Sequence, residues 1–415
     1  MRPVEGNRHI AIVCDTVPYP VRSGDNKRIG EMIHVLRGQG WIVHLVLTAL
    51  VDGISRKLCR RHVDALHIYH GRGLRTRFRN LLRLAVRRFD RIGSSLGCMP
   101  LEDLAARILG RRIVSRVGDY WQRYPAGLDR FLGKLCKKHG WNALIVEYIW
   151  LHHAIDKLPK GPIRILDTHD VQYKRVEEYA SVGIRFPLKI TFAEEAHILN
   201  RFDAAIAIQF QEATSIREMC PTLRVLIVGT SSSAQEHRAN NPIVGRILYV
   251  GGYNGANIDG LRCFLTRCWP SILELCPNVQ LYVCGYIYRA FLSEKFQNVK
   301  FLGHVNDIEN EYAKATLVIN PIRIGTGLKI KTVEALACRK PLVTTMKGVE
   351  GLNSECKKAC VVSTDEKDFV ENVVRLLDNV EARESLITAA DAFARTHLST
   401  PAVYKDLLNF LSELP

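Results

Sequence analysis

Residues 320–345, NPIRIGTGLKIKTVEALACRKPLVTT, carry the pattern with the clearest chemical meaning in this sequence. An apolar run leads into a loop with two glycines, Gly325 and Gly327, and a helix is expected to begin near Leu328. The backbone at Gly327 is assigned to diphosphate binding. The free N–H groups and the dipole of a helix start bind anions. Three cations surround the loop, namely Arg323, Lys329 and Lys331. Because cations oppose the dipole at a helix start, they favour a bound diphosphate over a purely structural role.

Glu334 follows this loop within the otherwise apolar stretch TVEALA. A carboxylate there costs free energy unless it accepts hydrogen bonds. Vicinal ribose hydroxyls would supply two donors at once. The sequence therefore favours ribose binding by Glu334, with a structural ion pair or cap as the alternative.

A second group of polar residues follows the apolar run in ILDTHD. Asp167, His169 and Asp170 are expected at the carboxyl end of a strand, where an open α/β sheet presents its ligand groups. Asp170 suits either an orienting partner or a helix N-cap. A single histidine often has a structural role, but this position favours a functional one.

The elements that position these residues are short apolar runs separated by segments of helical length. Before a polar stretch at residues 230–242 the sequence has RHIAIVCD, WIVHLVLTAL, DALHIYH, NALIVEYIW, GPIRILD, DAAIAIQ and RVLIVG. After it come GRILYVG, VQLYVCG, VKFLGHV, ATLVINP and KPLVTT. Runs that are apolar on both faces predict parallel sheets covered on both sides. We expect two doubly wound α/β domains of Rossmann type, over residues 1–230 and 243–398, with a ligand cleft between them. The amphipathic tail 399–415 is expected to pack back on the first domain.

The composition excludes a disordered, collagen-like or coiled-coil protein. The chain has 415 residues, 47% of them hydrophobic and 24% charged, as in globular proteins. No apolar run approaches the length of a membrane span, and the start lacks a secretory signal pattern. We expect a soluble cytoplasmic protein. The 12 cysteines show no zinc-type pairing and are interpreted as buried, reduced thiols.

The net charge of +16 is concentrated in residues 55–140, which hold 21 Lys or Arg and 6 Asp or Glu. Within this basic segment, residues 71–92 alternate an apolar stripe with arginines, among them Arg75, Arg79 and Arg83. Such a helix suits either the anionic inner face of a membrane or packing on the domain with a solvated basic side. The aromatic residues lie on the apolar stripe, so we do not expect a nucleic-acid partner.

These motifs, taken in order, resemble the glycosyltransferase group-one family of retaining GT-B enzymes. The resemblance rests on D-x-x-P-x-P-x-x-x-G-x-x-x-R at 15–28, D-T-H-D at 167–170, the segment EEAHILNRFDAAIAIQ at 194–209, and the run from GTGLKIKTVEALA to EGL at 350–352. It spans nearly the whole chain. The resemblance implies the GT-B fold, a nucleoside-diphosphate-sugar donor held mainly by the second domain, and a carbohydrate or lipid-linked acceptor held mainly by the first.

The resemblance also implies roles for individual residues. His169 would face the donor sugar, and Glu334 matches the second glutamate of the family's E-x7-E motif, which binds ribose. Thr326 stands where the first glutamate is expected, so contacts to the sugar hydroxyls differ here. The family's Arg and Lys after the first strand of the second domain are missing from YVGGYNGANIDG, and Arg323 and Lys329 are expected to replace them.

Glycine loops complete the predicted site. Gly252 and Asn254 would let the loop after the second domain's first strand approach phosphate, and Gly24 resembles the family's glycine on the diphosphate side of the cleft. Ordinary tight turns are the alternative for both loops. Arg28, which follows Gly24 by one helical turn, is assigned with the basic segment to the acceptor or membrane side.

The sequence thus predicts a retaining glycosyltransferase of surface polysaccharide or glycolipid biosynthesis. We expect it to use no metal and no cofactor, with the sugar nucleotide as its substrate. No carboxylate is placed as a glycosyl nucleophile, which favours displacement on one face of the sugar. A nucleotide-sugar epimerase and a non-catalytic nucleotide-sugar-binding protein are the alternatives. The missing first glutamate favours the latter.

Overall fold

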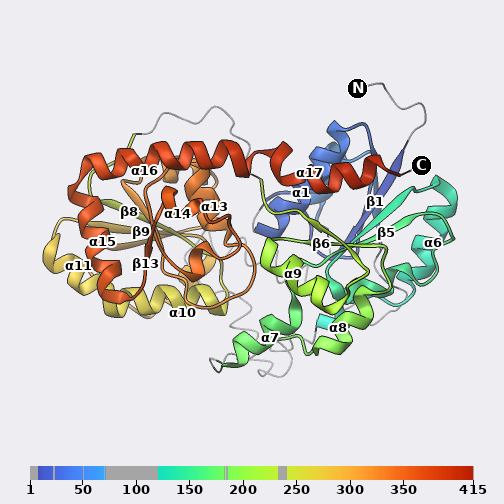
Figure 1. The fold of residues 1–415 in the computed structure, drawn as a ribbon, viewed down its shortest axis with the longest axis horizontal. Coiled ribbons are helices and arrows are strands. Elements are labelled where there is room, and N and C mark those ends of the chain that lie inside the picture. Colours follow the sequence, from blue (N-terminus) through green and yellow to red (C-terminus); the bar gives the residue numbers. More distant parts are fainter. Residues whose placement is uncertain are drawn as a thin grey trace.

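The computed structural model describes residues 8–21, 24–49, 51–69, 71, 120–181, 183, 186–231 and 241–414. They form two α/β domains that lie side by side, and the helices nearest the carboxyl end run along both of them (Figure 1). Two parallel sheets flanked by helices confirm the predicted fold class.

The first domain is built on a parallel sheet of seven described strands in the order β3-β2-β1-β4-β5-β6-β7. The strands are β1 (His9–Cys14), β2 (Ile42–Leu47), β3 (Ala65–Ile68), β4 (Ala143–Glu147), β5 (Ile163–Asp167), β6 (Ala204–Ala207) and β7 (Arg224–Ile227). The described helices around them are α1 (Gly24–Gly38), α2 (Gly53–His62), α6 (Leu128–His139), α7 (Gln172–Ser181), α8 (Phe192–Leu199) and α9 (Phe210–Met219). Short 3-10 helices span Tyr120–Arg123 and Ile149–Ile155.

The second domain has six described parallel strands in the order β10-β9-β8-β11-β12-β13. They are β8 (Arg246–Val250), β9 (Gln280–Cys284), β10 (Val299–Gly303), β11 (Leu317–Asn320), β12 (Leu342–Thr345) and β13 (Val361–Ser363). Its helices are α10 (Gly255–Cys263), α11 (Trp269–Leu275), α12 (Ile308–Lys314), α13 (Ile330–Ala337), α14 (Cys356–Ala359), α15 (Glu366–Asp378) and α16 (Val380–Phe393). Short π-helical segments span Phe264–Cys268 and Ala394–Leu398, and 3-10 helices span Tyr286–Ala290 and Lys347–Val349.

Each sheet is buried on both faces, as its apolar strands require. All five residues of β4 are buried, and alternate residues of β1 enter two different apolar clusters on opposite faces of the sheet. Burial on both sides explains why these strands read as continuous apolar runs. In both sheets the strand order reverses next to the first strand, β1 or β8, and ligands of such sheets bind at that point beyond the carboxyl ends.

The last helix, α17 (Thr400–Ser412), packs on the first domain although it follows the second in sequence (Figure 1). Tyr404, Leu407 and Leu411 are buried among residues of β1 and α1. Arg8 also donates hydrogen bonds to the carbonyls of Leu411 and Leu414. The chain therefore crosses between the domains twice, once after β7 and once before α17.

Candidate active site

The two domains contact each other across the carboxyl ends of their strands. Thr326 Oγ1 donates to Asp170 Oδ1 at 3.2 Å, and Lys27 Nζ lies 3.4 Å from Glu334 Oε1. A third contact, between Lys347 and Glu178, measures 2.6 Å. The glycine loop of the second domain and the DTHD turn of the first therefore lie face to face, as the sequence indicated.

The loop before α13 takes its shape from two left-handed glycines and one buried lysine. Gly325 has a φ of 110° and Gly327 a φ of 75°. Lys329 Nζ donates to the carbonyls of Gly325, Thr326 and Gly327 at 2.7, 3.2 and 2.6 Å. Burial lowers the pKa of Lys329. All three of its N–H groups are thus used inside the loop, which corrects the prediction that Lys329 binds the diphosphate: it shapes the loop instead.

Gly327 is a position where any side chain is expected to disrupt the contact between the domains. An added Cβ would lie 2.2 Å from Asp170 Oδ1, and the left-handed backbone costs about 1–2 kcal/mol for other residues. We expect Gly327→Ala to lower the thermal unfolding midpoint and to increase the radius of gyration measured by small-angle X-ray scattering. Gly53→Ala is the control, because a Cβ there meets no atom within 4 Å. A Gly327→Ala protein with the native scattering profile would contradict the expected loss of the contact between the domains.

Lys331 is the cation that the structure leaves at the start of α13. Its Nζ lies 2.5 Å from Asn257 Oδ1 and 3.2 Å from Tyr249 Oη. Among the ion pairs of the described residues none includes Lys331. Burial lowers its pKa to about 7, helped by the charge of Lys329 and opposed by that of Glu334. The sequence placed Lys331 near the loop but gave it no role of its own.

The start of α10 lies beside Lys331 and contains the second predicted glycine loop. Asn254 is the N-cap, since its side chain accepts the N–H of Asn257 at 2.9 Å. The amide of Asn257 in turn donates to the carbonyl of Gly252 at 3.0 Å. Gly252 is exposed, and a Cβ there would meet no atom within 4 Å. The starts of α10 and α13 are thus linked through Asn257 and Lys331.

Arg323 makes no contact with Lys331 or Asn257 among the hydrogen bonds and ion pairs of the described residues. Its Nη1 donates to Cys263 Sγ at 2.9 Å, and its Nε lies 3.5 Å from Asp259 Oδ2. Both partners belong to α10, and the Arg323 side chain is 43% exposed. We therefore correct the prediction that Arg323 holds the diphosphate, because a long side chain after β11 reaches α10 rather than the loop.

Glu334 lies at the domain interface with a side chain that is 19% exposed. Its Oε1 faces Lys27 of the first domain, and its Oε2 accepts from Tyr312 Oη at 3.3 Å. The carboxylate therefore already receives two donors, one on each oxygen. An interface carboxylate with this geometry is suited to a pair of neighbouring hydroxyls.

His169 forms a buried pair with Glu147. His169 Nε2 lies 2.6 Å from Glu147 Oε2, and the two side chains are 7% and 0% exposed. Burial opposes a positive charge on the ring, but the charges of Asp167 and Glu147 outweigh it and raise the pKa of His169. The left-handed backbone of His169, with a φ of 59°, is rare for a non-glycine residue and is typical of functional sites.

The positive charge of Arg28 balances the negative charges of Asp167 and Glu147, the buried carboxylates near His169. Its Nη1 pairs with Asp167 Oδ2, its Nη2 donates to the carbonyl of Val228 at 2.9 Å, and the side chain is 1% exposed. This corrects the assignment of Arg28 to the acceptor or membrane side, because a buried guanidinium reaches neither. Glu147, Asp167 and His169 also offer ligand atoms within 4.8 Å of one another, but Arg28 already balances part of their charge.

Tyr148 is a site residue that the sequence analysis missed. Its ring stacks on His169 at a centroid distance of 3.8 Å and on Trp150 at 4.3 Å. Its hydroxyl donates to Asp25 Oδ2 at 3.1 Å, and its φ is 71°. The aromatic pair in EYIW, directly after an apolar strand, was the available clue. Tyr148 fixes the plane of the His169 ring and joins β4 to α1.

Asp170 and Gly24, two further predicted residues, lie at contacts between the two domains. Asp170 receives Arg175 Nη1 at 2.5 Å in addition to Thr326, so it links α7 to the glycine loop. Gly24 begins α1, and a Cβ there would lie 1.8 Å from Ile330 Cδ1 at the start of α13. The helix starts of α1 and α13 are therefore in contact, and a larger residue at position 24 would require the Ile330 side chain to move.

Part of the predicted acceptor side lies outside the described residues. This holds for Arg75, Arg79 and Arg83 and for the helix expected over 71–92. In the parts of the chain that are described, no helix combines the length and the apolar character needed to cross a membrane.

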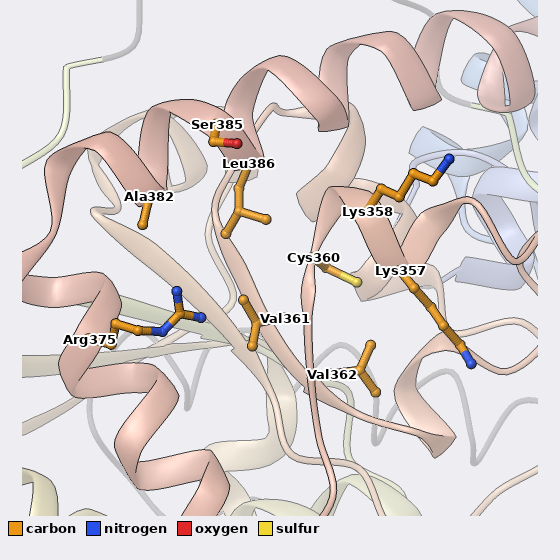
Figure 2. Close-up of a pocket in the computed structure, with 9 residues that line it drawn as sticks. All are labelled: Lys357, Lys358, Cys360, Val361, Val362, Arg375, Ala382, Ser385 and Leu386. Carbon is orange, nitrogen blue, oxygen red and sulfur yellow. The ribbon is translucent and has the colours of Figure 1, made fainter.

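A separate cavity of about 410 Å³ lies at the β13 edge of the second domain, away from the facing strand ends. Figure 2 shows it between the strand residues Val361 and Val362, Arg375 of α15, and Ala382, Ser385 and Leu386 of α16. It contains none of the residues that face each other across the cleft. This cavity is therefore separate from the residues that the sequence predicted for the site.

Comparison with known proteins agrees with the geometry. Residues 244–379 match the family model for glycosyl transferases of group 1. A curated protein from Klebsiella pneumoniae, described as an uncharacterized 44.6 kDa protein in the cps region, is 21% identical over 173 residues. That match covers 39% of this chain and 44% of the Klebsiella protein, so less than half of the relative is spanned.

Two solved structures resemble the whole chain. Sucrose-phosphate synthase from Thermosynechococcus elongatus has a TM-score of 0.69 at 14% identity and covers 98% of this chain and 99% of its own. The Anabaena protein HepE in complex with UDP has a TM-score of 0.64 at 12% identity and covers 98% and 100%. The resemblance seen in the sequence is confirmed: residues 244–379 match the group 1 glycosyl transferases, and the chain as a whole has the two-domain GT-B fold.

Proposed function

We propose that this protein transfers a sugar from a nucleoside-diphosphate sugar to an acceptor hydroxyl, with retention of the anomeric configuration. The proposal rests on the contact between the two domains. The start of α13, with Lys331 and Glu334, lies opposite the DTHD turn, which contains His169. Such a pairing provides a place for a diphosphate and a ribose opposite a group that can hydrogen-bond a sugar.

The diphosphate is assigned to the start of α13 and to Lys331. The helix supplies free N–H groups and the positive end of its dipole. Lys331 supplies a nearby ammonium whose present partners are the neutral Asn257 and Tyr249. As the sugar leaves, negative charge grows on the phosphate, so a cation placed beforehand stabilises the transition state most. On this proposal a divalent ion is not required.

The ribose is assigned to Glu334. Its two oxygens accept from Lys27 and Tyr312, and two ribose hydroxyls would likewise donate to a carboxylate. Donor binding would replace Lys27 at this carboxylate. Lys27 belongs to α1, so the exchange would couple the donor to the first domain.

The reaction on this proposal is a displacement on one face of the sugar. The bond from the anomeric carbon to the diphosphate oxygen breaks, and the bond to the acceptor oxygen forms on the same side. The proton of the acceptor hydroxyl passes to the departing phosphate oxygen. His169, oriented by Glu147 and Tyr148, would donate a hydrogen bond to the donor sugar.

The relatives guide the choice of ligands. HepE was solved with UDP and with UDP-glucose, and the Klebsiella relative is encoded in a cps region. We therefore propose UDP-sugars as the first donors to test and a carbohydrate or lipid-linked acceptor of surface polysaccharide assembly. Peripheral attachment to an anionic cytoplasmic membrane surface is proposed from the basic segment 55–140 alone.

The test begins with Glu334→Ala, which is expected to weaken UDP binding about 10- to 100-fold, the effect of losing hydrogen bonds to a charged group. Isothermal titration calorimetry measures the Kd, and Glu371→Ala on the exposed face of α15 is the control. UDP affinity equal to the native value would remove the ribose assignment.

Turnover then separates the alternatives. Release of UDP from a UDP-sugar that depends on an added acceptor supports the transferase. An isomerised donor without acceptor supports an epimerase, and donor binding without any turnover supports a non-catalytic binding protein. Either of the last two outcomes rejects the proposed function.

A further inference from the structure

Four histidines gather in the first domain, at the opposite end of the sheet from the cleft. His9 is the first residue of β1, His44 lies in β2, His67 lies in β3, and His139 ends α6. Helix α6, at the right of Figure 1, is far from the second domain. The group therefore has no part in the chemistry assigned to the cleft.

The nitrogens of these rings are close enough to share a ligand. Ligand atoms of His44, His67 and His139 all lie within 4.8 Å of one another. His44 Nδ1 is 3.3 Å from His67 Nε2, which is close to the separation of two nitrogens on a tetrahedral zinc ion with bonds of about 2.0–2.1 Å. His139 Nε2 is buried and has no hydrogen-bond partner among the described residues. A buried imidazole nitrogen without a partner calls for a ligand.

His9 has the geometry of an orienting partner. Its Nδ1 lies 2.9 Å from His44 Nε2. With the His44 proton on Nε2 and donated to His9, the Nδ1 lone pair of His44 is directed to the other two rings. Metal-bound histidines are commonly held in this way by a hydrogen bond to their second nitrogen.

The group offers an ion three imidazole nitrogens and no carboxylate oxygen. Asp64, the nearby carboxylate, is occupied by the N–H of Val43 and by Arg37. Neutral imidazoles without a carboxylate favour zinc and related first-row ions over magnesium or calcium.

We propose that His44, His67 and His139 form a zinc-type metal site, with His9 as the residue that orients His44. A bound ion would join the edge strand β3 and its neighbour β2 to the end of α6. His67 would bind the ion through Nε2 with its proton on Nδ1, and the metal would replace the hydrogen bond between His44 and His67. The site would stabilise the first domain without taking part in sugar transfer.

The test uses the full chain without an affinity tag, stripped with a chelator and titrated with Zn²⁺. We expect one ion per chain by isothermal titration calorimetry, and visible absorption bands of four-coordinate geometry when Co²⁺ is the probe. The double variant His67→Gln/His139→Gln should bind Zn²⁺ at least about 100-fold more weakly. His9→Gln should lose about 10- to 100-fold, as expected for an orienting partner.

The control is His197→Gln, which removes an exposed histidine of α8 and should leave binding within about twofold. Zn²⁺ should raise the thermal unfolding midpoint of the native and control proteins but not of the double variant. If the double variant does not fold, the single variant His67→Gln takes its place, since that ring is only half-buried. Absence of stoichiometric binding to the native chain, or equal affinity in native and variant proteins, would overturn the proposal.

Discussion

Replacing His169 with alanine is expected to lower kcat about 10²- to 10³-fold while the Kd for UDP changes less than about threefold. The factor is that of removing one fixed hydrogen-bond donor from a developing charge. On the proposed function the His169 ring would contact the sugar and not the nucleotide, so we expect the binding of UDP to be spared. Steady-state rates with a UDP-sugar and calorimetry with UDP measure the two effects. His153→Ala, an exposed histidine of the same domain, is the control.

The pH profile distinguishes this role from simple packing. Asp167 and Glu147 raise the pKa of His169 against the effect of burial. The protonated ring is therefore favoured below that raised pKa and is lost as the pH rises through it. We expect kcat to fall on the alkaline side, and Glu147→Gln to move the fall to lower pH. A His169→Ala enzyme with native turnover, or a profile that Glu147→Gln leaves unmoved, would exclude the role.

Replacing Lys331 with methionine is expected to weaken binding of a UDP-sugar about 10- to 100-fold, the value of a charge-assisted hydrogen bond. Burial lowers the pKa of Lys331 to about 7, so the cation is present below pH 7 and is lost above it. Native affinity should therefore decline as the pH rises from 7 to 9. A UDP-sugar is the better probe because, unlike UDP, its diphosphate does not titrate near neutrality.

Two further variants make this prediction specific. Lys331→Arg keeps the charge throughout this range, and its affinity should be nearly independent of pH. Lys367→Met removes a lysine of α15 that is 88% exposed and should bind as the native protein does. If Lys331→Met retains the native affinity and the native pH dependence, the diphosphate is held elsewhere and the proposed donor site is wrong.

The sequence predicted much of the scaffold because apolar runs and glycine loops are local properties. It predicted the parallel strands of both sheets, with the exception of β13, whose three residues are too short to stand out. The helix expected near Leu328 begins at Ile330. The DTHD turn and the glycine loop were expected at strand ends, and strand ends of two facing sheets necessarily meet in one cleft.

The sequence by itself determined the fold, the resemblance of residues 244–379 to group 1 glycosyl transferases and the two segments that face each other. The tertiary structure alone decided which charges remain available in the cleft. Arg28, Lys329 and Arg323 satisfy a buried carboxylate, three loop carbonyls and the side of α10, respectively, which leaves Lys331 at the helix start. The reason is that a long cationic side chain can reach several different partners. Which partner it binds depends on the groups that only the folded chain brings close to it.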